Sequence, residues 1–150
     1  MDSDKKRVIN LMLAVLLVLT LTFIWGNSLL SREKSAEASN GVLDMFSELF
    51  ERLGLDIKDD HWLRETAHFG EFCVLGCELA LLFFVNRGHR FSSAIFAASS
   101  ALAVALIDEG LQIFSHRAAE LKDVAMDFIG AVFSIALIGS LLALWKGRKQ

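Results

Sequence analysis

Proline is absent from the chain, and only two of its 150 residues are cysteine. The net charge is also small: 22% of the residues are charged, but the two signs nearly balance, and the formal net charge at pH 7 is -3. So small and dispersed a charge excludes a nucleic-acid partner held by a dense basic patch. What the chain has instead is apolar surface: 54% of the residues are hydrophobic and the mean hydropathy is +0.47, which predicts a membrane protein.

The two cysteines, Cys73 and Cys77, stand four residues apart in an apolar run, one helical turn apart on one face. A disulfide there is sterically poor, and no second pair of soft ligands exists for a metal, so both are predicted to be packing residues. The chain also lacks H-E-x-x-H, G-x-S-x-G, Walker and Rossmann motifs. Zinc-protease, serine-hydrolase and nucleotide chemistry therefore have no support from motifs.

Four long apolar runs predict an all-α integral membrane bundle of four transmembrane helices, forming one domain over residues 1–150. Each run can cross a hydrocarbon core of about 30 Å. The first run is longer than the apolar part of a signal peptide, so we expect an uncleaved spanning helix. The predicted helices cover residues of about 8–25, 67–85, 91–114 and 123–145.

The short basic flanks of these helices all fall on one side of the predicted bundle: Lys5, Lys6, Arg7, Arg87, Arg90, Lys146, Arg148 and Lys149. Excess basic charge marks the cytoplasmic side, so both termini are predicted to be cytoplasmic. Residues 26–66 then form the first extracytoplasmic loop. Apolar residues at helical spacing predict an extra amphipathic helix over about 41–53, either a plain cover of apolar surface or a lid on the bundle mouth.

Polar side chains inside the predicted spans need partners, because a charge at the bilayer centre costs at least ~2.5 kcal/mol. On the second helix, one histidine and two acids follow a single stripe, the deeper acid lying near the midplane. The third and fourth helices bring further acids and an amide toward the same outer side, with two arginines just outside. We predict a shared polar pocket of His68, Glu71, Glu78, Asp108, Glu109, Gln112, Asp123 and Asp127, with Arg64 and Arg117 as its bases.

Two interpretations of this pocket stay open. The network can serve only to fix helix packing and register. Alternatively it is a functional site, since clustered ionisable groups in a bilayer are functional candidates, and Glu71, Asp108 and Glu109 are then the catalytic candidates. One histidine with carboxylates can hold a divalent cation, but without a spaced pair of metal ligands the sequence predicts no metal and no other cofactor.

Three blocks of residues support a family resemblance that covers nearly the whole chain. The first is Trp25-Gly26-Asn27-Ser28 with Ser31, the second is Leu63-Arg64, Ala67-His68-Phe69, Glu71-Phe72 and Leu75-Gly76, and the third is Asp108-Glu109, Gln112, Phe114, Arg117, Asp123-Val124, Asp127 and Gly130. With these blocks the chain resembles the VanZ-like membrane proteins, a family named for a teicoplanin-resistance protein. It departs from the family at Ser115-His116, where a Pro-Gly turn is frequent, and at Asp127, where asparagine is common.

The resemblance implies a multi-pass cell-envelope protein of the bacterial cytoplasmic membrane, linked to glycopeptide (teicoplanin) resistance. It adds Trp25, Asn27 and Ser28 to the candidate binding residues. The first hypothesis is a non-enzymatic protein that binds a lipid-linked envelope precursor or a lipoglycopeptide at the outer leaflet. The alternatives are a membrane hydrolase or transferase acting on lipid-linked precursors, with Glu71 or Glu109 as base and Arg117 stabilising an anion, and ion or proton transport through Glu78.

Overall fold

The computed structural model describes residues 3–30, 37, 41, 60–87, 91–115 and 120–148, without the side chains of residues 60–64 and of Lys146. Within these residues there is no strand, and four long helices are present: α1 Ser3–Ser28, α3 Asp60–Arg87, α4 Phe91–Phe114 and α5 Leu121–Gly147. All four are long and apolar enough to cross a membrane, which confirms the predicted all-α, multi-pass bundle. The predicted amphipathic helix of about 41–53 lies outside the described residues.

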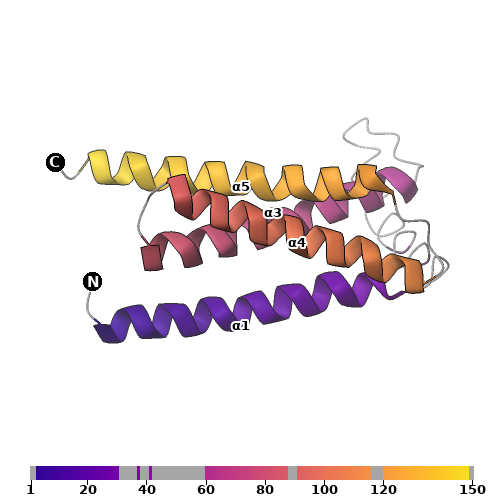
Figure 1. Cartoon of the computed structure of the whole chain (residues 1–150), viewed down its shortest axis with the longest axis horizontal. Coiled ribbons are helices and arrows are strands. Elements are labelled where there is room, and N and C mark those ends of the chain that lie inside the picture. Colours follow the sequence, from indigo (N-terminus) through magenta and orange to yellow (C-terminus); the bar gives the residue numbers. More distant parts are fainter. Residues whose placement is uncertain are drawn as a thin grey trace.

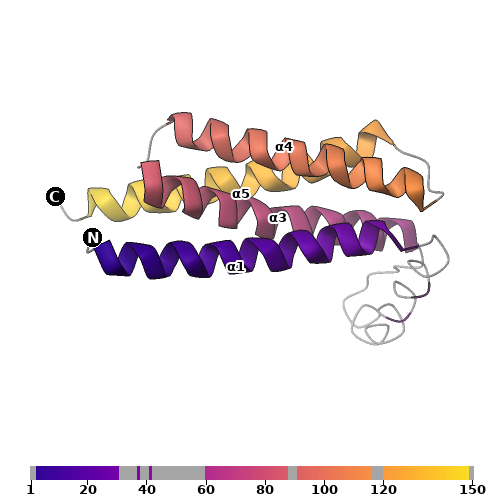
Figure 2. The same ribbon diagram turned by 60° about the horizontal axis from the view of Figure 1, so that its bottom comes forward.

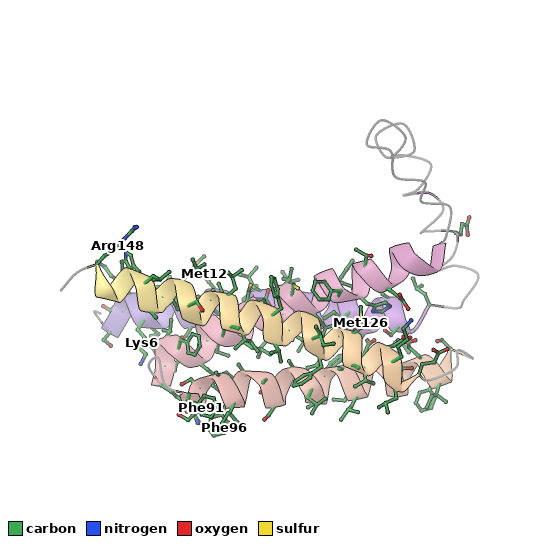
Figure 3. All side chains as sticks on the ribbon, turned by 90° about the horizontal axis from the view of Figure 1, so that it is seen from above. Lys6, Met12, Phe91, Phe96, Met126 and Arg148 are labelled. Atoms are coloured by element: carbon green, nitrogen blue, oxygen red, sulfur yellow. The ribbon has the colours of Figure 1, made fainter. Side chains whose placement is uncertain are left out.

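The four helices run side by side and alternate in direction (Figures 1 and 2). Both chain termini lie at the same end of the bundle, as do the end of α3 and the start of α4 (Figure 1). We call this end the terminal end. Figure 3 shows Lys6, Phe91 and Arg148 there, and Met126 toward the opposite end. That opposite end, where α1 and α4 finish and α5 begins, is called the polar end below.

Helix α3 is the centre of the bundle, because it packs against α1, α4 and α5, and most extensively against α5. In the apolar windows of these helices, 39% of the residues are buried in α3 but only 11% in α1, so α1 is the peripheral helix. Glycines let α3 and α5 approach closely. A Cβ on Gly76 would lie 2.5 Å from the carbonyl oxygen of Ala131, and one on Gly130 would lie 2.6 Å from that of Phe69.

The bundle is apolar outside as well as inside. Phe72, Leu75 and Ala101 are fully buried in the core, whereas side chains such as Leu11 and Phe133 remain more than half exposed. Exposed apolar surface on this scale is expected where helices face lipid rather than water. Both cysteines are free, and the Cys73 thiol donates to the carbonyl oxygen of Gly130 at 3.2 Å, as expected for packing residues.

Candidate functional site

Polar side chains from all four helices gather at the polar end of the bundle. We call them the polar cluster; α1 contributes Asn27 and Ser28, α3 His68 and Glu71, α4 Asp108 and Gln112, and α5 Asp127. Because the helices alternate in direction, residues near the ends of α1 and α4 meet residues near the starts of α3 and α5. The structure thus brings together five of the residues that the sequence predicted to share a pocket, and with them Asn27 and Ser28, which the family resemblance added.

Asp108 is at the centre of the polar cluster and is fully buried. The Ser28 hydroxyl of α1 donates to its Oδ1 atom at 2.6 Å. The Gln112 amide, one turn further along α4, donates to its Oδ2 atom at 3.3 Å. Hydrogen bonds to both carboxylate oxygens fix the orientation of this side chain and connect α1 to α4.

Other buried polar atoms of the cluster have no hydrogen-bond partner in the part of the chain that the structure describes. The Asn27 amide donates to Oε1 of Glu71 at 3.0 Å, but Oε2 of Glu71 has no such partner. The same holds for Oδ1 of Asp127, a residue only 2% exposed, and, outside the cluster, for the indole nitrogen of Trp25 in α1. Each such atom costs about 1–3 kcal/mol, so their presence suits a site built to receive a ligand.

One histidine and two carboxylates converge within this cluster. His68, Asp108 and Asp127 each offer a nitrogen or oxygen atom, and these atoms all lie within 4.8 Å of one another. They come from α3, α4 and α5 respectively. Imidazole nitrogen and carboxylate oxygen are both common metal ligands. The sequence-based prediction of no cofactor is not tested by the structure and stays a prediction.

Three acids predicted for the pocket have separate partners or positions. Oε1 of Glu109 accepts the backbone N–H of Glu120, which links the residue just before α5 to α4. Glu78 lies deeper, where the Thr20 hydroxyl donates to its Oε1 atom at 2.9 Å. Asp123 is half-buried in the first turn of α5, a favourable place for an acid at a helix N-terminus.

The two arginines predicted beside the pocket cannot be placed in the site. Arg64 belongs to α3, but its side chain is not described, and Arg117 lies outside the described residues. Their predicted contacts with the acids therefore stay predictions. At this end, Lys122 of α5 forms an ion pair with Glu65 of α3, which joins two neighbouring helices.

Two contributors were missed by sequence reasoning. The Ser115 hydroxyl lies 3.0 Å from the carbonyl oxygen of Ser28 and 2.9 Å from that of Gln112, so it joins the ends of α1 and α4. Thr20 partners Glu78, and it stands seven and eight residues before Asn27 and Ser28, on the same face of α1. That spacing was a usable signal for Thr20, whereas nothing in the sequence pointed to Ser115.

An apolar groove is separate from the polar cluster. It has a volume of about 520 Å³ and lies between α3, α4 and α5, toward the terminal end, with Phe84, Phe91, Ala94 and Ala143 among its lining residues. No residue of the polar cluster lines it.

Comparison with known proteins gives one match. The VanZ/LLP1 family model matches residues 11–143, a range that includes parts of all four helices and the entire polar cluster. No curated protein and no solved structure matches the chain. The match extends over most of the chain and agrees with the three blocks of residues quoted above. The chain belongs to the VanZ/LLP1 family.

Proposed function

We propose that this chain is a cell-envelope protein of the bacterial cytoplasmic membrane that binds a lipidated or lipid-linked molecule at the outer leaflet. By doing so it protects the cell against lipoglycopeptides such as teicoplanin. The supporting observation is the set of buried polar atoms of Trp25, Glu71 and Asp127 that have no hydrogen-bond partner among the described residues. A polar pocket within apolar helices suits an amphiphile that has a polar head and an acyl chain.

The charge pattern supports the outer leaflet as the place of binding. Basic residues cluster near both termini, and with the termini in the cytoplasm the polar cluster faces the outer leaflet. The carboxylates of Glu71, Asp108 and Asp127 favour a head group that is cationic or bridged by a cation. Since the apolar groove is nearer the terminal end, we expect the ligand's acyl chain to lie in the bilayer against the helices.

A resistance assay tests the proposal. In a susceptible bacterium without a VanZ-family protein, producing this chain is expected to raise the minimal inhibitory concentration of teicoplanin by several dilution steps. The minimal inhibitory concentration of a glycopeptide without an acyl chain should not change, because such a compound lacks the lipid part of the ligand. Asp108→Asn is expected to lose the protection, since it removes the central charge that Ser28 and Gln112 orient.

The matched control is Glu120→Gln, which changes an exposed acid at the same end of the bundle. Protein levels in the membrane are compared by immunoblot, so that loss of folding is not mistaken for loss of function. Full protection by Asp108→Asn, or equal protection against the acyl-free glycopeptide, would contradict the proposal.

A second candidate function is hydrolysis or group transfer on a lipid-linked envelope precursor. The observation that favours it is the hydrogen-bonded orientation of Asp108 and Glu71, which suits general acid–base catalysis. If the chain is an enzyme, Glu71→Gln should slow product formation by the purified protein by about 10²–10⁴-fold. A parent protein that releases no product from lipid-linked precursors would remove this candidate.

Ion or proton transport is the least supported alternative. It requires a path from Glu78 to the terminal end, but α4 has no acidic residue before Asp108 and α5 has none after Asp127. In a vesicle flux assay, the parent and Glu78→Gln are accordingly expected to behave alike.

A further inference from the structure

We propose that His68, Asp108 and Asp127 bind one first-row divalent metal ion at the polar end of the bundle. This proposal does not depend on the proposed lipid binding, because it concerns only what the three side chains can coordinate. The starting observation is the convergence of one ligand atom from each residue within 4.8 Å. The three residues come from three different helices, so an ion there would link α3, α4 and α5.

The spacing fits a single ion. Ligand atoms at about 2.0–2.2 Å from one metal lie about 3–4.4 Å from each other, depending on whether they are adjacent or opposite. Atoms within 4.8 Å of one another therefore need only small side-chain movements to close around an ion. Two of the three residues, Asp108 and Asp127, are buried, which keeps bulk water from competing for the same positions.

Asp127 supplies the independent evidence for a missing ligand. It is 2% exposed, and its Oδ1 atom is buried without a hydrogen-bond partner in the described part of the chain. Buried polar atoms are nearly always hydrogen-bonded, and a buried carboxylate is costly unless it is paired or coordinates a metal. Coordination of an ion through this oxygen, together with Asp108 and His68, would give it a partner.

The surroundings of Asp108 resemble the support that metal ligands receive in proteins. Carboxylates that bind metals are themselves hydrogen-bonded, and these partners set their orientation. Ser28 donates to Oδ1 of Asp108 at 2.6 Å and Gln112 donates to Oδ2 at 3.3 Å. A carboxylate has about four lone-pair sites, so these two hydrogen bonds are compatible with coordination of an ion.

The donor set defines the class of ion. One imidazole nitrogen with two carboxylate oxygens suits a first-row ion such as Zn²⁺ or Mn²⁺ better than Ca²⁺, which prefers six to eight oxygen ligands. Two carboxylates and a neutral imidazole around a divalent cation also give zero net formal charge, which lowers the cost of charge in an apolar bundle. Three protein ligands leave further coordination positions for water or for an oxygen of a bound molecule.

Metal analysis of the full-length protein in detergent or nanodiscs tests the proposal. The protein is stripped with a chelator, incubated with Zn²⁺ or Mn²⁺, freed of unbound ion by gel filtration and analysed by mass spectrometry of the metal. We expect one ion per chain for the parent and for Glu120→Gln, an exposed acid at the same end. Asp127→Asn and His68→Gln are each expected to weaken binding at least tenfold.

A second measurement covers the case in which a variant fails to fold. X-ray absorption of the zinc-loaded parent should show nitrogen and oxygen ligands at about 2.0–2.2 Å and no sulfur at about 2.3 Å. A sulfur shell would place the ion on Cys73 or Cys77 and overturn the proposal. It would equally be overturned by a parent that binds no ion, by full binding in folded Asp127→Asn, or by displacement of the ion by an equal concentration of Ca²⁺.

Discussion

Gly76→Ala is expected to lower the free energy of unfolding by about 1–3 kcal/mol, although it adds a single methyl group. The added Cβ would lie 2.5 Å from the carbonyl oxygen and 2.8 Å from the Cα of Ala131. Both are backbone atoms of α5 and cannot rotate away, so α3 and α5 must separate along their closest contact. Unfolding of the purified protein in detergent, followed by circular dichroism against temperature or denaturant, measures the loss.

Gly70→Ala is the matched control, because Gly70 belongs to the same helix but a Cβ there meets nothing within 4 Å. Alanine is the better helix former, so this variant should be unchanged or more stable by about 0.5–1 kcal/mol. Equal destabilisation by both variants would mean that the effect comes from α3 itself rather than from its approach to α5.

Removing the polar contacts of α1 is expected to release this helix from the bundle. Its side chains reach the other helices through hydrogen bonds from Thr20 to Glu78, from Asn27 to Glu71 and from Ser28 to Asp108. Interhelical hydrogen bonds in membranes contribute on average about 0.6 and at most about 1.7 kcal/mol each. Replacing all three donors (Thr20→Val, Asn27→Leu and Ser28→Ala) should thus cost about 2–5 kcal/mol of α1 docking.

Chemical cross-linking reports the release directly. Asn10 of α1 and Asn86 of α3 exchange hydrogen bonds at 2.9 and 3.0 Å, so cysteines at these two positions, with Cys73 and Cys77 replaced by alanine, form a cross-linkable pair. The yield should fall sharply in the triple variant. It should be unaffected by Thr22→Val, because the Thr22 hydroxyl donates only within α1, to the carbonyl oxygen of Val18. An undiminished yield in the triple variant would show that these three hydrogen bonds are not needed to hold α1 in the bundle.

The fold was predictable because a helix that spans a membrane needs a long run of apolar residues, and such runs are visible in the sequence. The helices nevertheless extend past these runs: α1 begins at Ser3 and includes Lys5 and Lys6, and α3 begins at Asp60. Hydropathy marks only the part of a helix that lies in hydrocarbon, while polar residues continue the same helix in the interface. Helix ends were therefore the less predictable part.

The sequence could predict those parts of the candidate site that depend only on how far along a helix a residue lies and on which face of the helix it stands. Alternating helix direction brings Glu71, Asp108 and Asp127 to the same end, and the stripe on α3 turns Glu71 inward. Individual partners were not predictable in this way. Glu109 bonds to a loop amide and Glu78 to Thr20 because of which helices are neighbours and how their side chains point. The convergence of His68 with Asp108 and Asp127 depends on three helices at once and leaves no local spacing to detect.

The alternating helix directions also govern the electrostatic field at the polar end. The N-termini of α3 and α5 and the C-termini of α1 and α4 meet there, and their opposite partial charges of about half an elementary charge cancel in pairs. The helix termini therefore do not offset the negative charge of the carboxylates in the polar cluster. A negative potential enriches cations from solution at the mouth of the bundle, and salt at 0.15 M confines this enrichment to about 8 Å.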